Sequence, residues 1–350
     1  MIREYFLGGN TSEGFFSYYD YLADGESFNK IYIIKGGPGT GKSTTMKEVG
    51  KWGEKKGFDV DYIHCSSDPN SLDGVIIKNI GVAMVDGTAP HIVDPKNAGV
   101  VESIVNMGDF WDENKLKEKK NEIIDLNRQI SKYFNQAYNF LEAAGKLMPG
   151  NRINPDKEGA LEIAEHIVSG ISKNSSNKIG SVRKLFSEAI TPEGLVSYAS
   201  GFKYKNRFVL KSEISTGAGV VQELIYKKII EKGYDIELFY SPFDPKNEVR
   251  HIVIPEAETC ILTSDFMSFI EEKDAEIVDI DEYMEQKTFG ADFLKSKLLI
   301  ITLFQRAVKK ISMAKKLHDD LEKCYVPCVD FKQMEVCRAK ILKEIEEFAQ

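Results

Sequence analysis

The chain carries an internal repeat, and this repeat constrains its architecture more than any other feature of the sequence. Four segments of the first half recur in the second half: 2–18 as 182–198, 31–42 as 207–218, 55–69 as 231–245, and 133–147 as 303–317. A repeat that spans nearly a whole half predicts two copies of one folding unit. With 350 residues, the chain also has the length expected of two domains.

Both halves follow one order of patterns, which predicts the α/β class. An opening turn is followed by a strand, a loop, a helix, a second strand, further short strands and a long helical arm. Alternating strands and helices are typical of a parallel sheet that is covered on both faces. We therefore expect two tandem P-loop NTPase-like domains with parallel sheets, residues 1–175 and 176–350. The boundary is expected within 170–180, which is polar, contains glycine and lacks apolar periodicity.

A P-loop motif in the first half predicts a phosphate-binding site. The apolar stretch 31–34 leads into GGPGTGKST at 36–44, and the residues that follow favour a helix. Glycines at this spacing allow backbone N–H groups to turn inward on an anion, which also meets the positive end of the helix dipole. The residues expected to bind ATP are Gly36, Gly37, Pro38, Gly39, Thr40, Gly41, Lys42, Ser43 and Thr44.

The chemistry of this motif assigns roles to individual side chains. Lys42 is expected to stabilise charge on the β- and γ-phosphates, and the Ser43 hydroxyl is expected to bind Mg²⁺. A second Mg²⁺ ligand is expected at Asp86, because the apolar strand 82–86 ends in this carboxylate. Asp94 is the alternative ligand, and a plain strand-end turn is the alternative explanation of Asp86.

The second copy of the motif lacks the groups that phosphate chemistry needs. Four positions change: Gly36 to Ser212, Gly39 to Ser215, Lys42 to Ala218 and Ser43 to Gly219. Without the ammonium and the hydroxyl, we expect a degenerate site without catalysis. The segment 260–264 is also neutral where the first copy has Asp86. Asp68, in contrast, recurs as Asp244, which favours a turn or capping role for it.

Further polar groups near strand ends occur only in the first half. Asp73 aligns with Val249, and His64 aligns with Tyr240. Asp73 is the third candidate catalytic residue, because a carboxylate at this place would orient water or a substrate hydroxyl, as would His64. Surface solvation of Asp73 and strand-edge packing of His64 are the alternatives, and His91 is a weaker candidate.

Arginines are scarce in the first half, which has Arg3, Arg128 and Arg152. Nucleotide monophosphate kinases hold two sets of phosphates with several arginines, so this scarcity argues against such a kinase. An arginine finger would come from the second half. The candidates are Arg183, Arg207 and Arg250, with surface exposure as the alternative for each.

Long helical arms are predicted in both halves. In 113–147 the spacing of three and four residues recurs over nine positions: Leu116, Ile123, Leu126, Ile130, Tyr133, Ala137, Phe140, Ala144 and Leu147. This heptad seam is expected to stop at Pro149 and Gly150. A second arm is predicted over about 291–322, before a C-terminal helix. The arms are expected to pack on one another or on a second copy in a homodimer, with a peptide groove as the alternative.

Composition and charge exclude several functional classes. The net charge of -8 argues against nucleic acid as a partner. No apolar run approaches the length of a membrane span and the first residues lack a signal pattern, so we expect a cytoplasmic protein. The five cysteines predict free thiols. Cys324, Cys328 and Cys337 match no zinc spacing and are expected in helix packing, with a metal or redox role as the alternative.

Five segments together resemble a known family: GGNTSEGFFSYYDYL at 8–22, KGGPGTGKST at 35–44, HCSSDPNSLDG at 64–74, VDGTAPHIVDPKN at 85–97 and NMGDFWDENKL at 106–116. Over essentially its whole length, the chain is similar to a family of uncharacterised bacterial ATP-binding proteins that are tandemly duplicated P-loop NTPases. The resemblance implies ATP binding and hydrolysis in the cytoplasm, without an assigned substrate. It also implies a complete P-loop in both halves of many members, from which 212–219 departs.

These observations predict a Mg²⁺-dependent ATPase or nucleotide switch. The N-terminal domain would bind and hydrolyse ATP, and the C-terminal copy would regulate it or bind a protein or small-molecule partner. A small-molecule or nucleotide kinase is one alternative, and a non-catalytic nucleotide-binding scaffold is another.

Overall fold

The computed structural model describes residues 1–22, 28–148, 156–171, 178–212, 215–271, 273–283 and 291–350. The strands of the first half are β1 (Ile2–Tyr5), β2 (Gly8–Thr11), β3 (Gly14–Ser17), β4 (Lys30–Lys35), β5 (Val60–His64), β6 (Leu72–Ile77), β7 (Val82–Asp86) and β8 (Glu102–Asn106). Those of the second half are β9 (Val182–Leu185), β10 (Glu188–Thr191), β11 (Gly194–Ser197), β12 (Asn206–Lys211), β13 (Ile236–Ser241), β14 (Asp244–Ile254), β15 (Thr259–Ser264) and β16 (Glu276–Asp279).

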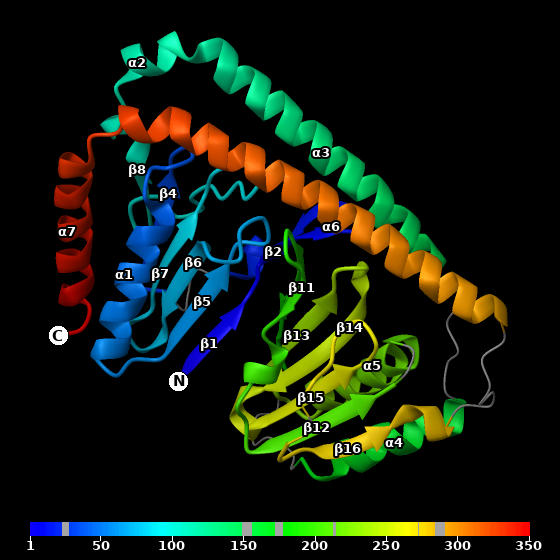
Figure 1. Cartoon of the computed structure of the whole chain (residues 1–350). Helices are drawn as coiled ribbons and strands as arrows, with labels where there is room; N and C mark the ends of the chain where they lie inside the picture. Colours follow the sequence, from blue (N-terminus) through cyan, green and yellow to red (C-terminus); the bar gives the residue numbers. More distant parts are fainter. Residues whose placement is uncertain (23–27, 149–155, 172–177, 213–214, 272, 284–290) are drawn as a thin grey trace.

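The helices of the first half are α1 (Lys42–Lys55), α2 (Glu113–Glu118), α3 (Lys120–Leu147) and α4 (Lys157–Ser169). Those of the second half are α5 (Ser215–Glu231), α6 (Ala291–Tyr325) and α7 (Phe331–Glu347). Together the elements form a mixed α/β structure with three sheets (Figure 1). The predicted helix stop at Pro149 and Gly150 lies outside the described residues, as does most of the predicted boundary at 170–180.

Two six-stranded sheets, one in each half, share the same strand order. The first sheet runs β1-β5-β6-β7-β4-β8, and the second runs β9-β13-β14-β15-β12-β16. Corresponding neighbours also pair in the same sense, for example β4 with β7 and β12 with β15, which are both parallel. The repeat in the sequence therefore has a counterpart in the order of the strands.

The sheets are mixed, so the prediction of parallel sheets is wrong. Strand β6 runs antiparallel to β5 and β7, and β14 runs antiparallel to β13 and β15. The connections explain this difference, because only residues 65–71 join β5 to β6 and only 78–81 join β6 to β7. A parallel pair needs a crossover of about a dozen residues or more. The three strands β7, β4 and β8 remain parallel.

A third sheet joins the halves at the centre of the molecule. It consists of the hairpin β2–β3 and the hairpin β10–β11, paired through Asn10 and Ile190. Phe6 and Phe186, which precede the two hairpins, exchange backbone hydrogen bonds of 2.8 and 3.0 Å. The opening segment of the repeat thus builds the contact between the two copies.

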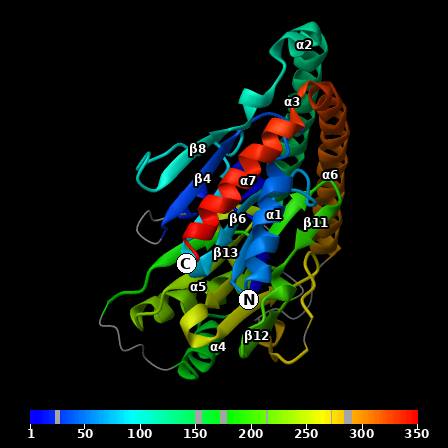
Figure 2. The same cartoon turned by 90° about the vertical axis from the view of Figure 1, so that its left-hand side faces the viewer.

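The two halves exchange their last helices. Helix α4 packs against α5 of the second half, where the Lys232 ammonium donates to the Val168 carbonyl at 2.8 Å. Helix α7 lies beside α1 of the first half (Figure 2), and its Ile341 and Ile345 are buried with Met46 in one apolar cluster. Each sheet is therefore partly covered by a helix that follows the arm of the other half.

The long arms pack against one another. Helix α3 lies along α6 on the side of the molecule drawn at the top of Figure 1, and Ala137, Leu141, Ile300 and Ala307 are buried between them. The prediction that the arms pack together is confirmed within one chain. The first arm is two helices rather than one, because the helix is interrupted at Lys119.

A buried group of charges lies where the first and second sheets approach each other. The Arg3 guanidinium of β1 donates to both Asp61 oxygens at 3.1 and 2.9 Å, and also to Glu237 of β13 at 2.9 Å. Arg183, the counterpart of Arg3, donates to Glu237 at 3.1 Å. Burial alone would raise the pKa of Asp61, but the positive charges of Arg3 and Lys78 outweigh it and lower this pKa to about 2.

This lowered pKa predicts a loss of stability in acid. The pKa of Asp61 in the folded protein is below its ordinary value of 3.8, so its contribution is present above pH 4 and is lost as the pH falls towards 2. We expect this one group to account for about 2 kcal/mol of the free energy of unfolding. Urea unfolding of the wild type and of Asp61→Asn between pH 6 and about 2.5 measures it. Equal pH dependence in the two proteins would contradict the assignment.

Candidate functional site

The P-loop lies between β4 and α1, as the sequence predicts. Gly39 and Gly41 have φ angles of 70° and 73°, in the left-handed region that glycine adopts without strain. The Thr40 hydroxyl donates to the Gly37 carbonyl at 2.8 Å and closes the loop on itself. Helix α1 begins at Lys42, so the loop lies at the positive end of this helix.

The Lys42 ammonium lies inside the loop. It donates to the carbonyls of Gly36 and Gly37 at 2.8 and 2.9 Å, and its nitrogen lies 3.5 Å from Oδ2 of Asp86. The Lys42 side chain is 15% exposed and the Asp86 side chain 13% exposed, so the pair is largely shielded from water. The structure therefore brings together two of the predicted catalytic residues, one from α1 and one from the end of β7.

Backbone N–H groups donate hydrogen bonds to both predicted Mg²⁺ ligands, Ser43 and Asp86. The Leu72 N–H donates to the Ser43 hydroxyl oxygen at 2.9 Å. The Thr88 N–H donates to Oδ1 of Asp86 at 2.8 Å, while the Thr88 hydroxyl donates to the Gly36 carbonyl at 3.1 Å. Thr88 thus connects the carboxylate to the first glycine of the P-loop. The sequence reasoning missed Thr88, although its place two residues after a strand-end aspartate is typical of such a turn.

Asp94 is placed differently from Asp86. Its side chain is 75% exposed and forms an ion pair of 3.2 Å with Lys35. The Lys35 ammonium also donates to the carbonyls of Gly87 and Val93, at 2.7 and 2.9 Å. Asp94 therefore helps to hold the segment after β7, whereas Asp86 faces the P-loop lysine.

Asp73 is buried rather than solvated at the surface. It lies on β6 next to Gly74, which pairs with Val85 of β7, so Asp73 and Asp86 occupy neighbouring positions on adjacent strands. Burial raises the pKa of Asp73, and the negative charge of Asp86 raises it further. Nε2 of His91 lies 3.2 Å from Oδ2 of Asp73. The surface alternative for Asp73 is wrong, and His91, the weaker candidate, is its partner.

The remaining predicted polar groups have structural contacts. The His64 ring stacks on Tyr198 with centroids 4.5 Å apart, which matches strand-edge packing. Asp68 accepts hydrogen bonds from the Asn70 N–H and the Ser71 hydroxyl in a turn. The three candidate arginine fingers donate hydrogen bonds to residues of the second half: Arg183 to Glu237, Arg207 to the Glu271 carbonyl and Arg250 to Asp265.

The end of α6 and the start of α7 cover the P-loop from outside, and the sequence did not indicate this. A methyl group placed on Gly39 would lie 2.7 Å from Cγ2 of Val326, and one on Gly41 would lie 3.1 Å from Sδ of Met334. We call residues 325–338 the C-terminal cap. A side chain at Gly39 would therefore clash with Val326 and one at Gly41 would be tight against Met334, so packing favours glycine here in addition to the backbone turn that requires it.

The C-terminal cysteines belong to this region and serve packing. Cys324 and Cys328 are buried, and the Cys328 thiol lies 3.5 Å from the Cys324 carbonyl oxygen. All five cysteines of the chain are free thiols. Within the described part of the chain, the side chains grouped closely enough to hold a metal ion are Cys65, Asp73 and His91, so the C-terminal cysteines do not form such a group.

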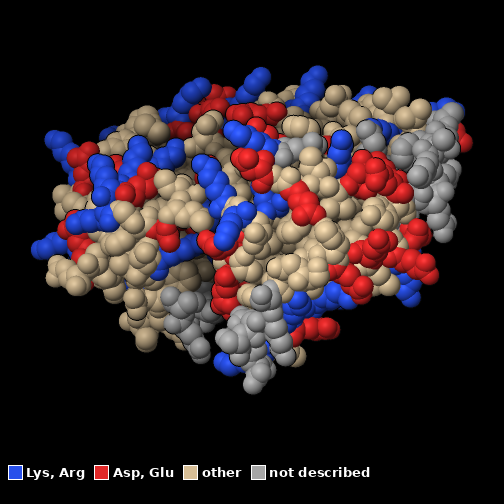
Figure 3. Space-filling model, turned by 90° about the horizontal axis from the view of Figure 1, so that it is seen from below, with Lys and Arg blue, Asp and Glu red and all other residues tan. Residues whose placement is uncertain are grey.

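No family model, curated protein or solved structure matches this chain. Among the described helices, none combines the length and the apolar character that crossing a membrane requires. On the face drawn in Figure 3, lysines and arginines are interspersed with aspartates and glutamates rather than gathered in a continuous basic surface.

Proposed function

We propose that this protein binds a nucleoside triphosphate with Mg²⁺ at residues 36–44 and hydrolyses it. The observation that carries the proposal is the position of the Lys42 ammonium, which lies between two P-loop carbonyls and the Asp86 carboxylate. A phosphate would take over these contacts, because the ammonium and the inward-turning N–H groups of a glycine loop are both anion ligands.

The residues present fit a Mg²⁺ ion. Ser43 supplies a hydroxyl oxygen and Asp86 a carboxylate oxygen, and hard oxygen ligands of this kind are those that Mg²⁺ takes in phosphate-binding sites. The ion would supply positive charge to the phosphates. The chain itself would orient the phosphates through the loop, neutralise charge through Lys42 and hold both oxygen ligands through the Leu72 and Thr88 N–H groups.

The second half fits a regulatory role in this proposal, which is that of a tandem P-loop NTPase with one intact site. Its sheet has the strand order of the first, while Ala218 is buried where the first half has Lys42. Helix α6 leads directly to Val326, the residue after its last turn, which packs against Gly39 of the P-loop. A movement of the P-loop on nucleotide binding would therefore displace the end of α6. This displacement would transmit the nucleotide state to the second half or to a partner.

A kinase is the second candidate, and the observation in its favour is the buried Asp73–His91 pair close to Asp86. Such a pair is a general base if an acceptor hydroxyl reaches it. Incubation of the full chain with ATP and Mg²⁺ separates the functions. Free phosphate supports hydrolysis, a phosphorylated acceptor supports a kinase, and binding without turnover supports a scaffold and overturns the proposal.

The choice between the two candidate Mg²⁺ ligands gives a specific prediction. Asp86→Asn is expected to lower Mg²⁺-dependent hydrolysis about 10²-fold, because it removes a buried negative charge from the metal site. Asp94→Asn is expected to change the rate by about twofold or less, since its ion pair with Lys35 is exposed. Steady-state rates at varied Mg²⁺ measure both variants. The reverse order of effects would assign the metal to Asp94.

A further inference from the structure

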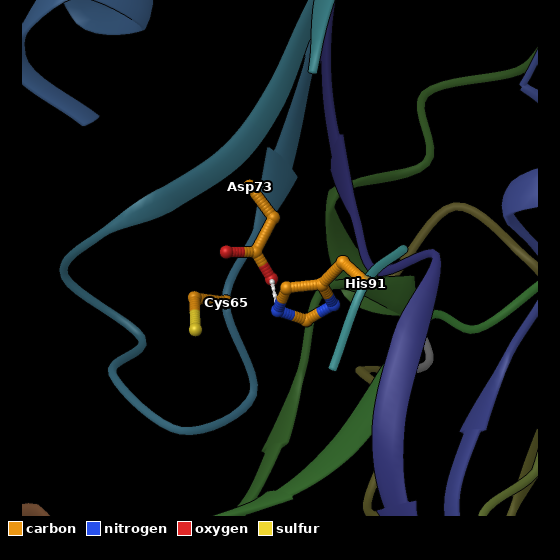
Figure 4. A group of neighbouring side chains, drawn as sticks. All are labelled: Cys65, Asp73 and His91. Atoms are coloured by element: carbon orange, nitrogen blue, oxygen red, sulfur yellow. Dashed lines mark ion pairs between the residues drawn. The ribbon is translucent and has the colours of Figure 1, made fainter. Parts of the chain in front are cut away.

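A second group of potential ligands lies beside the proposed nucleotide site. Cys65 follows β5, Asp73 lies on β6 and His91 follows β7, so three separate segments bring them together. Figure 4 shows the Asp73 carboxylate between the Cys65 thiol and the His91 ring. Asp73 and His91 are 4% and 8% exposed, which places the group inside the protein.

The ligand types match one class of metal ion. A thiolate, an imidazole nitrogen and a carboxylate oxygen are the ligands of Zn²⁺ and related divalent ions, whereas Mg²⁺ and Ca²⁺ take oxygen almost alone. The thiolate and carboxylate together carry two negative charges, which balance the charge of a divalent ion. Three protein ligands leave the fourth position of a tetrahedral ion open, as in catalytic zinc sites.

The distances allow such an ion after a small adjustment. One ligand atom from each of Cys65, Asp73 and His91 lies within 4.8 Å of the others. Zinc bonds of about 2.0–2.3 Å place tetrahedral ligand atoms roughly 3.3–3.8 Å apart. The group therefore has to contract by at most about 1.5 Å, and His91 and Asp73 are already within 3.2 Å of each other.

Some buried polar atoms in and around this group lack hydrogen bonds within the described part of the chain. Oδ2 of Asp73 lies 3.2 Å from Nε2 of His91 but forms no hydrogen bond of ordinary geometry with a described residue, and the buried Tyr19 hydroxyl also forms none. The Tyr19 ring packs on His91 with centroids 5.3 Å apart. Buried polar atoms without a partner are unfavourable, and a metal ion with its water ligand would satisfy them.

The second half provides a control for the role of these residues in folding. Cys65 aligns with Ser241, and the strand pairing places Arg250 where the first sheet has Asp73, yet the second sheet still forms with the same strand order. The fold of the repeat therefore does not require the group. Among the described residues such a group occurs only in the half that has the intact P-loop, which favours a function tied to that half.

We propose that Cys65, Asp73 and His91 bind a divalent metal ion of the zinc class, at a site separate from the Mg²⁺ ligands Ser43 and Asp86. The ion would lie beside the phosphate end of the nucleotide site, with its open position available to water. Binding of this ion does not depend on the P-loop function and can be tested without nucleotide.

Cobalt is the probe, because Co²⁺ replaces Zn²⁺ and its bond to a thiolate gives a charge-transfer band. Metal-free full-length protein titrated with Co²⁺ is expected to develop this band to one equivalent, and Zn²⁺ is expected to abolish it. Cys65→Ser should remove the band and weaken binding at least tenfold, while Cys337→Ser, a half-buried thiol on α7, should change neither. No band in the wild type, or a band retained in Cys65→Ser, overturns the proposal.

Two further measurements keep the result interpretable. Lys42→Ala should retain the cobalt band, so a failure of the nucleotide proposal leaves this one standing. If Cys65→Ser does not fold, alkylation of the wild-type protein replaces it. Zn²⁺ should slow the modification of Cys65 at least tenfold relative to Cys337, and Mg²⁺ should not; equal rates with and without Zn²⁺ contradict the site.

Discussion

Lys42→Ala is expected to lower Mg²⁺-dependent ATP hydrolysis by about 10²- to 10³-fold. The lysine is the one ammonium that donates to the P-loop carbonyls of Gly36 and Gly37 among the described residues. Removing one preorganised donor from a shielded site costs about this factor in rate. Phosphate release by the purified full chain, measured at saturating ATP, gives the effect on the catalytic step.

The second half shows that this substitution is compatible with the fold. Ala218 occupies the position of Lys42 near the start of α5 and is completely buried, and the helix forms there. A loss of activity in Lys42→Ala with an unchanged unfolding temperature would therefore report on chemistry. Lys47→Ala is the matched control, since Lys47 lies on the same helix and, among the described residues, donates a hydrogen bond only to the Asn70 carbonyl at the surface. Equal rates in Lys42→Ala and the wild type would exclude hydrolysis at this P-loop.

Local motifs predicted the core of the candidate site. The P-loop and Asp86 were found from sequence because their residues are close together or follow an apolar strand directly. Lys42 and Asp86 meet because β4 and β7 are parallel neighbours, with Ile34 opposite Asp86. The carboxyl ends of parallel strands lie at one edge of a sheet, so a correct strand assignment is enough to predict this contact.

The partners of Asp73 could not be predicted in the same way. Cys65 and His91 approach it only because β6 is antiparallel between β5 and β7, and the sequence favoured parallel sheets. In an all-parallel sheet, the start of β6 would lie at the opposite edge from the P-loop. The direction of one strand thus decides whether Asp73 belongs to the site.

The packing of α4 and α7 on the opposite halves also could not be predicted from the sequence. Both helices are amphipathic, but periodicity states only that one face is buried and does not name the surface that buries it. The long helix α3 leads to α4, which packs on the second half, and the long helix α6 leads to α7, which packs on the first half. The C-terminal cap reaches the P-loop by this route, which explains why Val326 and Met334 gave no signal as site residues.

The halves are held together by buried charges as well as by apolar contacts. Arg3 and Arg183 occupy equivalent positions on β1 and β9, and Asp61 and Glu237 occupy equivalent positions on β5 and β13. Arg3 is 5% exposed and binds carboxylates from both halves. Loss of Arg3 would leave Asp61 with Lys78, and Glu237 with Arg183, as the remaining positive partner among the described residues.

Arg3→Ala is expected to lower the free energy of unfolding by about 3–5 kcal/mol, because it leaves Asp61 and Glu237 buried with fewer positive partners. Arg3→Lys should recover only part of this loss, since a single ammonium cannot bond two carboxylates as the planar guanidinium does. Urea unfolding at pH 7 measures both variants, with Arg128→Ala, an exposed pair with Asp125, expected to stay within about 0.5 kcal/mol of the wild type. A loss no larger for Arg3→Ala than for Arg128→Ala would mean that the apolar contacts and the central sheet alone join the halves.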